Sequence, residues 1–184
     1  MMARVPRLET AELSLRALTS GDASEEYLGW LNDPDVLRYR APRVARSTMD
    51  DVHRYIDGIA ARGDLVLAIH LKATGRHIGN IALNTILPVH GTAELSLMLG
   101  AKDIWGRGLA KEAIEVVSAH AFGAMALRRL WAESPNPAFN AVVKRLGWAH
   151  EGTKRRAFAL DGGYVDIECW GLLQDEFRPR LAAV

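Results

Sequence analysis

Apolar and polar positions alternate with a period of two in several stretches of the chain, and this alternation predicts strands. In the first half, turn residues such as Thr74-Gly75 and Pro88 separate these stretches, which favours a meander of antiparallel strands. Near the C-terminus, Asp161-Gly162-Gly163 lies between two strand-like stretches and predicts a hairpin. The predicted strands span residues 13–18, 65–71, 78–86, 92–99, 129–133, 153–160 and 164–173.

Apolar positions spaced three and four residues apart, together with capping residues, predict four helices between these strands. Asp22, with Glu25 three residues later, is typical of a helix start, and Asp33-Pro34 should end that helix. Asn136 favours another start, because asparagine caps a helix well and the following proline suits the first helical position. The other two helices are expected from Ser47 or Thr48 to Gly63 and from Leu109 to about Ala124. This order predicts one mixed α/β sheet, antiparallel in its first half, with strand-helix-strand connections in its second half and helices around it.

The length and composition favour a single domain. The chain has 184 residues, of which 49% are hydrophobic, and this suits one well-buried core within a domain of residues 1–184. It has no apolar run of about 18 residues, and residues 1–6 lack the apolar core of a signal peptide, so we expect a cytoplasmic protein without a membrane partner. Because 23 lysines and arginines face 22 acidic residues, there is no basic field, and we expect no nucleic-acid partner.

The cysteine and histidine content argues against a metal site. Cys169 is the only cysteine, which excludes an internal disulfide, and the apolar-rich sequence around it predicts a buried structural thiol rather than a nucleophile. The six histidines show no spacing typical of metal ligands. We therefore expect no metal.

The most informative part of the chain is the junction after residues 93–99, where a strand runs into a glycine-rich loop and then a helix. Gly106 and Gly108 lack a β-carbon and lie just before the first helical residues, so the backbone can approach a ligand closely there. The first turn of a helix has amide N–H groups without internal partners and carries the positive end of the helix dipole, which suits a phosphate. Arg107 and Lys111 add positive charge. An anion cradle is one interpretation of this loop, and an ordinary tight turn is the other.

Several segments, taken in order, resemble the GNAT superfamily of N-acetyltransferases. The strand, loop and helix of residues 93–113 are similar to its coenzyme A pyrophosphate loop. Asn136, Leu146-Gly147-Trp148 and Glu151-Gly152 follow the pattern of its N-x-x-S, LGF and EG segment. The first and last parts of the chain resemble the RimJ/RimL branch, and the resemblance covers about residues 8–177.

The resemblance implies a mostly antiparallel mixed sheet of about seven strands, flanked by about four helices and splayed at a slot that holds acetyl-CoA. The edge of the strand at Ser96–Leu99 would then pair with the pantetheine arm, and the glycine-rich loop would hold the pyrophosphate. The residues implied in binding acetyl-CoA are Ser96, Leu97, Met98, Leu99, Trp105, Gly106, Arg107, Gly108, Leu109, Ala110, Lys111, Asn136, Phe139 and Lys144.

Transfer of an acetyl group from a thioester to an amine needs a base for the ammonium proton and a proton for the departing thiolate. Glu94 is the carboxylate on the strand facing the slot and is a candidate catalytic base, although it could instead pair with an arginine or lie exposed. Asn136 matches an asparagine that lies beside pantetheine in relatives, and it could cap a helix as well. Phe139 stands where the superfamily often has a serine that protonates the thiolate, so we expect it to line the core or a tunnel. Tyr164 is either a substitute catalytic acid or a plain hairpin residue.

The acceptor is the part of the reaction that the sequence determines least. Polar and aromatic residues in the segments that bind substrate in the superfamily are Trp30, Asn32, Arg38, Tyr39, Asn80 and Asn84, and each could serve packing instead. The sequences of residues 30–34 and 77–81 resemble members that acetylate nucleotide-linked amino sugars, so we expect a small-molecule primary amine. The alternatives are the α-amino group of a protein or peptide, and a noncatalytic acyl-CoA-binding module. A monomer or a homodimer is expected.

Overall fold

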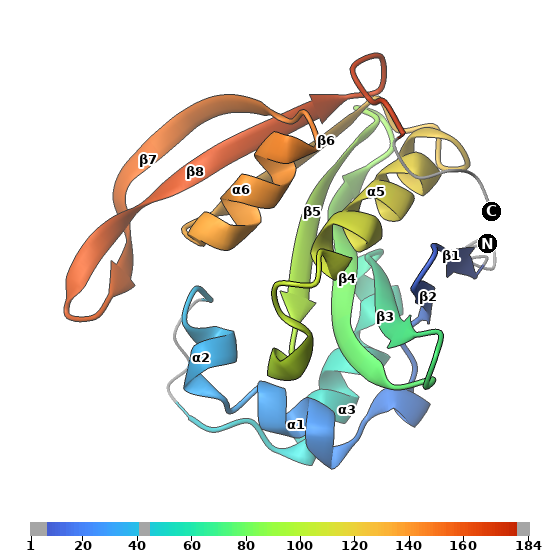
Figure 1. Ribbon diagram of the computed structural model, residues 1–184, viewed down its shortest axis with the longest axis vertical. Coiled ribbons are helices and arrows are strands. Elements are labelled where there is room, and N and C mark those ends of the chain that lie inside the picture. Colours follow the sequence, from blue (N-terminus) through green and yellow to red (C-terminus); the bar gives the residue numbers. More distant parts are fainter. Residues whose placement is uncertain (1–6, 41–44, 180–184) are drawn as a thin grey trace.

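The computed structural model describes residues 7–40 and 45–179, and its strands form one eight-stranded sheet (Figure 1). The order across the sheet is β1-β2-β3-β4-β5-β6-β8-β7, and every neighbouring pair is antiparallel except β5 with β6. The strands are β1 (Leu8–Glu9), β2 (Leu13–Ala17), β3 (Leu65–Leu71), β4 (His77–Leu87), β5 (Thr92–Leu99), β6 (Arg129–Ser134), β7 (Ala149–Leu160) and β8 (Gly163–Leu173). The expectation for residues 1–6 lies outside the described residues.

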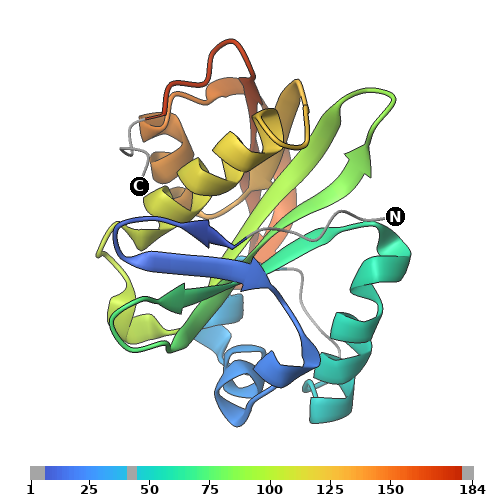
Figure 2. The ribbon, with the colours of Figure 1, turned by 90° about the vertical axis from the view of Figure 1, so that its right-hand side faces the viewer.

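Helices cover both sides of this sheet, with α5 and α6 on one side and α3 and α4 on the other (Figure 2). The helices of the described ranges are α1 (Glu25–Trp30), α2 (Pro34–Leu37), α3 (Met49–Asp57), α4 (Ile59–Arg62), α5 (Leu109–Phe122) and α6 (Pro137–Arg145). The predicted mixed α/β class is confirmed, although the prediction of about seven strands and four helices is too low. The elements it missed, β1 and α2, are too short to show a period of their own. The single helix predicted up to Gly63 is divided at Gly58 into α3 and α4.

The predicted caps explain where two of the helices begin. Thr48 accepts a hydrogen bond from the backbone N–H of Asp51, whose carboxylate in turn accepts one from the Thr48 backbone, so α3 begins with a complete capping box. The side-chain oxygen of Asn136 accepts a hydrogen bond from the Ala138 backbone at 2.9 Å and starts α6 as predicted. Local sequence therefore determines both starts.

The predicted start of α1 at Asp22 is wrong. Ser24 caps this helix by accepting a hydrogen bond from the Tyr27 backbone at 3.1 Å. Asp22 is instead buried, and its carboxylate accepts hydrogen bonds from both terminal nitrogens of Arg16. Burial raises the pKa of Asp22, but hydrogen bonds from His70, Arg16 and Thr19 outweigh this effect and hold the pKa well below its usual range. The ion pair with Arg16 and the hydrogen bonds from Thr19 thus occupy the carboxylate that the sequence pattern assigned to the start of α1.

The hydrophobic core lies where β2 to β5 meet the helices. Leu13, Leu15, Ile69 and Ile78 are fully buried on these strands, and Ile114 of α5 is fully buried against them. The β7–β8 hairpin contributes much less, because most of the residues of β7 are exposed. The position of β5 in space is therefore determined by the first half of the chain.

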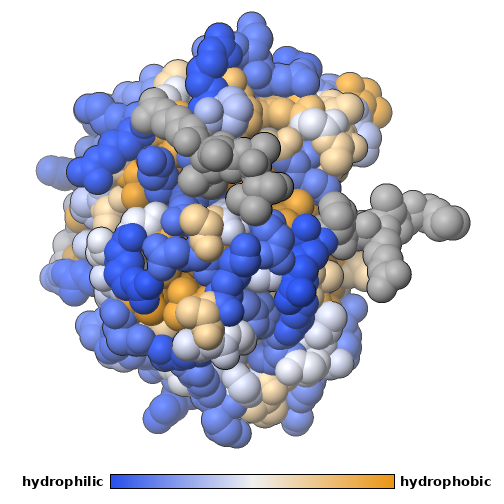
Figure 3. All heavy atoms as spheres, turned by 45° about the vertical axis from the view of Figure 1, so that its right-hand side comes forward, coloured by the Kyte–Doolittle hydropathy of each residue, from blue (hydrophilic) through white to orange (hydrophobic). Residues whose placement is uncertain are grey.

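The face drawn in Figure 3 is mainly hydrophilic, with apolar side chains in small separate patches. Across residues 7–40 and 45–179, no helix is long and apolar enough to cross a membrane, and no group of three or more side chains suits a metal ion. Cys169 is half-buried rather than buried as expected, because its thiol lies 3.9 Å from Oε1 of Glu133 on the polar hairpin side of the sheet.

Candidate active site

The strands β5 and β6 separate soon after they begin to pair. Their parallel pairing runs from Thr92 opposite Arg129 to Glu94 opposite Trp131. Beyond this point β5 continues to Leu99 against β4, and β6 continues to Ser134 against β8. Among the residues that the structure describes, none pairs as a strand with the edge of β5 that faces β6 along Ser96–Leu99, which is the splay that the resemblance implied.

The glycine-rich loop lies just after the end of β5. Gly106 and Gly108 both have left-handed backbone conformations, with φ of 81° and 83°, and nothing lies within 4 Å of the position that a β-carbon would take at either residue. Gly108 is the residue before α5, so the amide groups of the first turn of that helix adjoin this open space. Trp105 ties the loop to β5 by donating a hydrogen bond from Nε1 to the Leu99 carbonyl at 3.0 Å. A helix N-terminus beside an unfilled backbone cradle fits a pyrophosphate group.

The predicted basic residues of the loop take different positions. Arg107 pairs with Glu12 at 2.7 Å on the surface, and it would have to leave this partner to contact a phosphate. Lys111 lies in the first turn of α5, where its backbone N–H donates to the Gly108 carbonyl. Leu109 is fully buried, so any contribution that it makes to a ligand comes from its backbone.

The third wall of the slot is the start of α6. Phe139 is half-buried and packs against the hydrophobic core, as expected for a residue that cannot donate a proton. The amide of Asn140 is already used, since it donates to the Ser134 carbonyl and accepts a hydrogen bond from the Trp170 indole. Lys144 is exposed in the last turn of the helix, away from its N-terminus.

Glu94 lies at the point where β5 and β6 part, and its side chain is half-buried. Burial raises the pKa of Glu94, the neighbouring carboxylates Glu133 and Asp64 raise it further, and the Lys154 ammonium lowers it. On the adjacent strand β4, Asn84 is opposite Glu94 in register and donates a hydrogen bond to the Ser96 hydroxyl at 2.9 Å. A carboxyl group with a raised pKa, at the mouth of a slot, is a better proton acceptor than an exposed one.

Three of the residues expected to bind substrate make contacts within the protein. Trp30 is 6% exposed and packs against Tyr27, His77 and the bare backbone of Gly100, where a β-carbon would collide with the indole. The amide of Asn32 donates to the carbonyl groups of Leu28 and Ser47 and accepts from the Ser47 backbone. Asn80 is buried, and its side-chain oxygen lies 2.9 Å from Nε2 of His77. The indole of Trp30 and the amides of Asn32 and Asn80 thus make internal contacts, which favours the packing alternative for these residues.

The remaining acceptor candidates lie at the entrance. Arg38, just after α2, pairs with Asp161 at the tip of the β7–β8 hairpin, and the Tyr39 ring lies 5.8 Å from its guanidinium group. Figure 1 shows α2 between α1 and the hairpin, on the side toward which β5 and β6 open. Tyr164 also lies near the hairpin tip and is 71% exposed, and β8 pairs with β6 only from Glu168 onward. The structure therefore does not bring Tyr164 to Glu94, and the interpretation as a substitute acid receives no support.

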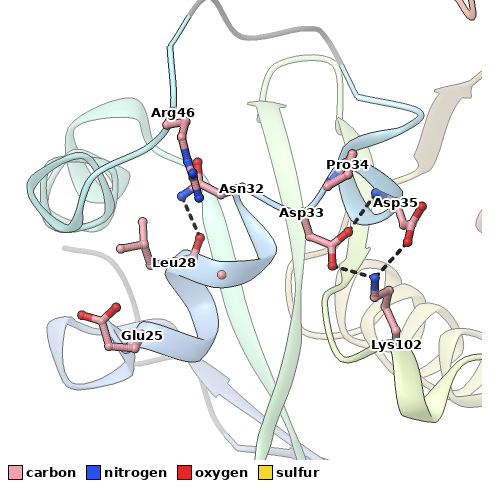
Figure 4. Close-up of a pocket in the computed structure, with 9 residues that line it drawn as sticks. Glu25, Leu28, Asn32, Asp33, Pro34, Asp35, Arg46 and Lys102 are labelled. Carbon is pink, nitrogen blue, oxygen red and sulfur yellow. Dashed lines mark hydrogen bonds and ion pairs between the residues drawn. The ribbon is translucent and has the colours of Figure 1, made fainter.

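Two surface hollows accompany the slot. One, of about 480 Å³, lies beside α1 and α2 and contains Asn32; in it Lys102 bridges Asp33 and Asp35 at 2.7 and 2.9 Å (Figure 4). The other, of about 450 Å³, lies between α6 and the hairpin and contains Lys144. Neither includes Glu94 or the glycine-rich loop, so neither is the slot itself.

The sequence analysis missed the charged residues around Glu94. Asp64, Glu133 and Lys154 come from three separate parts of the chain, and all three act on the pKa of Glu94. Strand periodicity places Glu133 on the same face as Trp131, which is opposite Glu94. The sequence of β6 could therefore have indicated Glu133 as a neighbour of Glu94. No sequence pattern indicated that Lys154 or Asp64 lies near Glu94, because isolated charged residues are common along a chain.

Comparisons with known proteins agree with this geometry. Residues 12–149 match the family model of the acetyltransferase (GNAT) domain. The chain is 29% identical over 175 residues to the uncharacterized N-acetyltransferase p20 of Bacillus licheniformis, covering 92% of this chain and 97% of that one. The spermidine N-acetyltransferase from Vibrio cholerae, solved in complex with CoA and spermine, superposes with a TM-score of 0.81 at 22% identity, over 90% of this chain and 98% of that one. RimL, a ribosomal L7/L12 α-N-protein acetyltransferase solved with coenzyme A, gives 0.80 at 19% identity, over 91% and 98%.

Proposed function

Because the chain belongs to the GNAT family of acetyltransferases, we propose that it transfers the acetyl group of acetyl-CoA to the primary amine of a small molecule. The observation that carries the proposal is the half-buried carboxyl group of Glu94, with its raised pKa, at the point where β5 and β6 separate. Acetyl-CoA supplies an acyl group already activated as a thioester. The residues of this chain hold that group, deprotonate the acceptor and restrict which acceptors enter.

The glycine-rich loop and β5 are proposed to position the donor. The first-turn amides of α5, next to Gly106 and Gly108, suit the pyrophosphate, and the free edge of β5 at Ser96–Leu99 can pair with amide groups as another strand would. The same edge supplies backbone N–H groups for the oxyanion that forms during transfer. Together, these contacts would hold the thioester of acetyl-CoA beside Glu94.

Glu94 is proposed to accept the proton of the incoming ammonium group, directly or through water. An alkylamine with a pKa of roughly 10 is almost fully protonated at neutral pH, so it needs a base before it can attack. The departing thiolate needs no dedicated acid, since a thiol titrates at about 8.5 and water can protonate it. This accounts for Phe139 at the position where relatives often have a serine.

The entrance favours a small acceptor. The pair between Arg38 and Asp161 joins the segment after α2 to the hairpin tip, and this contact would have to open before a folded protein could present its N-terminus. The segments that favoured an amino sugar, residues 30–34 and 77–81, use Trp30, Asn32 and Asn80 in contacts within the protein. The proposal therefore names a small primary amine without a sugar requirement.

A competition assay tests the proposal. Small mono- and diamines, amino sugars, nucleotide-linked amino sugars and short N-terminal peptides are offered with acetyl-CoA, and thiol release is measured, with Glu94→Gln as the matched variant. We expect turnover with a small amine that depends on Glu94. A clear preference for peptides would overturn the small-molecule half, and binding of acetyl-CoA without turnover of any amine would favour a noncatalytic acyl-CoA module.

A further inference from the structure

One amine of the protein itself lies on the face of the sheet that carries Glu94. Trp131 is opposite Glu94, and Glu133 follows two residues later on β6, so its side chain points to the same face. Glu133 is opposite Cys169 on β8. Lys154 is two residues beyond Gly152, the partner of Cys169 on β7, and therefore shares this face as well.

Contacts bring the Lys154 amine close to the site. Its Nζ lies 2.5 Å from Oε2 of Glu133, and Sγ of Cys169 lies 3.9 Å from the other oxygen of that carboxylate. The lysine side chain is 52% exposed, so only the ion pair holds it and its rotamers remain accessible. Glu133, above all, raises the pKa of Lys154, and Cys169 and Glu94 add to this, so the charges of Lys154 and Glu94 act on each other.

The backbone around Lys154 is also irregular. The register of β7 against β8 shifts between His150 and Gly152 and again between Lys154 and Phe158, where Arg156 has a φ of 52°. Such bulges bend a strand and redirect its side chains, and they are frequent beside active sites. Lys154 thus lies between two irregularities of β7, the edge strand of the sheet beside β8.

We propose that Lys154 is a self-acetylation site, whose ε-amine leaves Glu133 and takes the acetyl group from acetyl-CoA bound in the slot. This rests on the donor half of the proposed function and on Glu94 as base. Glu94 accepts one proton from the Lys154 ammonium, and the nitrogen lone pair forms the amide bond to the acetyl carbon. The carbon–sulfur bond breaks, and coenzyme A leaves as a thiolate. The second proton lost by the nitrogen protonates that thiolate through solvent.

The modification would change the site as well as the lysine. An acetyl-lysine is neutral, so Glu133 would lose its counterion. Because the Lys154 ammonium now lowers the pKa of Glu94, its removal would raise that pKa further. The acetylated protein should therefore need a higher pH for the same turnover of an external amine, which makes the modification self-limiting.

Two of the other lysines provide internal comparisons. Lys72 pairs with Glu9 at 3.0 Å, and Lys102 pairs with Asp33 and Asp35. Neither shifts the pKa of Glu94. A reaction that requires the slot should modify Lys154 ahead of these residues, whereas uncatalysed acetylation by the thioester would follow exposure alone.

The experiment incubates the full chain with acetyl-CoA and no external amine, and follows intact mass and the modified peptides with time. We expect one acetyl group, on Lys154, at a rate that is independent of protein concentration. Glu94→Gln should slow the reaction at least tenfold at neutral pH. Glu133→Gln should accelerate it there, because the pKa of Lys154 then falls and more free amine is present. Lys154→Arg should remove the modification, and Lys102→Arg should leave it unchanged.

The outcomes separate this inference from the proposed function. Calorimetric binding of acetyl-CoA and turnover of an external amine, with Lys154 unmodified, would overturn the self-acetylation alone. Acetylation spread over all lysines and insensitive to Glu94→Gln would also overturn it, as uncatalysed chemistry. Absence of acetyl-CoA binding would overturn both proposals.

Discussion

The two halves of the sheet differ in how far their side chains are buried. In β3, Val66–Ile69 are all buried, and β4 likewise buries a continuous run from Ile78 to Leu83. In the β7–β8 hairpin, most of β7 is exposed, and charged side chains such as Lys154 pair at the surface. Figure 1 shows the hairpin extending away from the strands of the first half. The halves join through the short parallel pairing that ends at Glu94 and Trp131.

This difference explains why the candidate site lies at the junction. The buried half holds β5, and with it Glu94, in one position, because close-packed interiors resist displacement. The open half borders the slot with exposed charged residues that can exchange partners at little cost in free energy. A donor can thus be held against the buried half while the acceptor side adapts.

Glu94→Gln should have the largest effect, because it removes the base at the junction while keeping the size of the side chain. We expect kcat/KM to fall by roughly 100- to 1000-fold at neutral pH, within the range for loss of a general base. The raised pKa of Glu94 means that wild-type activity should decline as the pH falls through that value. The loss in the variant should shrink at high pH, where the amine is deprotonated unaided. An equal loss at every pH in thiol-release assays would assign Glu94 to structure.

Asp22→Asn tests the rigidity of the buried half. The substitution leaves Arg16 and His70 facing a neutral amide, and we expect unfolding to become easier by about 2–3 kcal/mol, below the full range for a buried pair because Arg16 is partly exposed. Since folding lowers the pKa of Asp22, its contribution is complete above the ordinary pKa of about 3.9 and is lost as the pH falls. Urea unfolding at several pH values measures both the loss of stability in the variant and the pH dependence of stability in the wild type. The matched Asp161→Asn, in the exposed hairpin pair, should change stability by less than about 0.5 kcal/mol; equal losses would contradict the contrast between the halves.

Gly108→Trp tests the loop that joins the core to the donor. A side chain at a φ of 83° costs about 1–2 kcal/mol of strain, and the indole would fill the space beside the first turn of α5. The Kd for acetyl-CoA should rise at least tenfold by calorimetry. Gly63→Trp, at a φ of 73° just after α4 on the other side of the sheet, carries similar strain away from the loop and should leave the Kd unchanged. If the folded Gly108 variant binds acetyl-CoA with unaltered affinity, the loop is a turn without a role in binding.

Asn136→Ala separates capping from binding. Loss of the cap on α6 should reduce stability by about 1 kcal/mol, and Thr48→Ala should do the same through α3. Only the Asn136 variant should also weaken acetyl-CoA binding, because α6 borders the slot and α3 lies on the other side of the sheet (Figure 2). Matching affinities in the two variants would show that Asn136 acts as a cap alone.

Arg38→Ala should have the smallest effect. Exposed ion pairs contribute about 0.2–1 kcal/mol, so removing the contact with Asp161 should change the KM for the acceptor by a few-fold and leave stability nearly constant. The KM for acetyl-CoA should not change. If the entrance limits acceptor size, the variant should also gain activity on longer amines or peptides in steady-state assays, and no change in that preference would remove the size argument.

Patterns that act within a few residues determined much of this protein from its sequence alone. Alternation predicted β3, β4 and β5 within one residue at each end, capping chemistry predicted the starts of α3 and α6, and two glycines predicted a loop before α5 whose backbone is open to a ligand. These features follow from backbone geometry and short-range hydrogen bonds, which adjacent residues encode. The resemblance of ordered motifs predicted the family in the same way.

Only the tertiary structure decided what surrounds Glu94 and which polar residues serve the interior. The sequence left Trp30, Asn32 and Asn80 open between substrate binding and packing. Contacts with Gly100, Ser47 and His77, which come from elsewhere in the chain, favour packing. Glu133 and Lys154 come together through the register of β6, β8 and β7, which is set by strand pairing between residues far apart in sequence. A register difference of one residue would reverse the face of every side chain, and no local pattern fixes it for an exposed, charged hairpin.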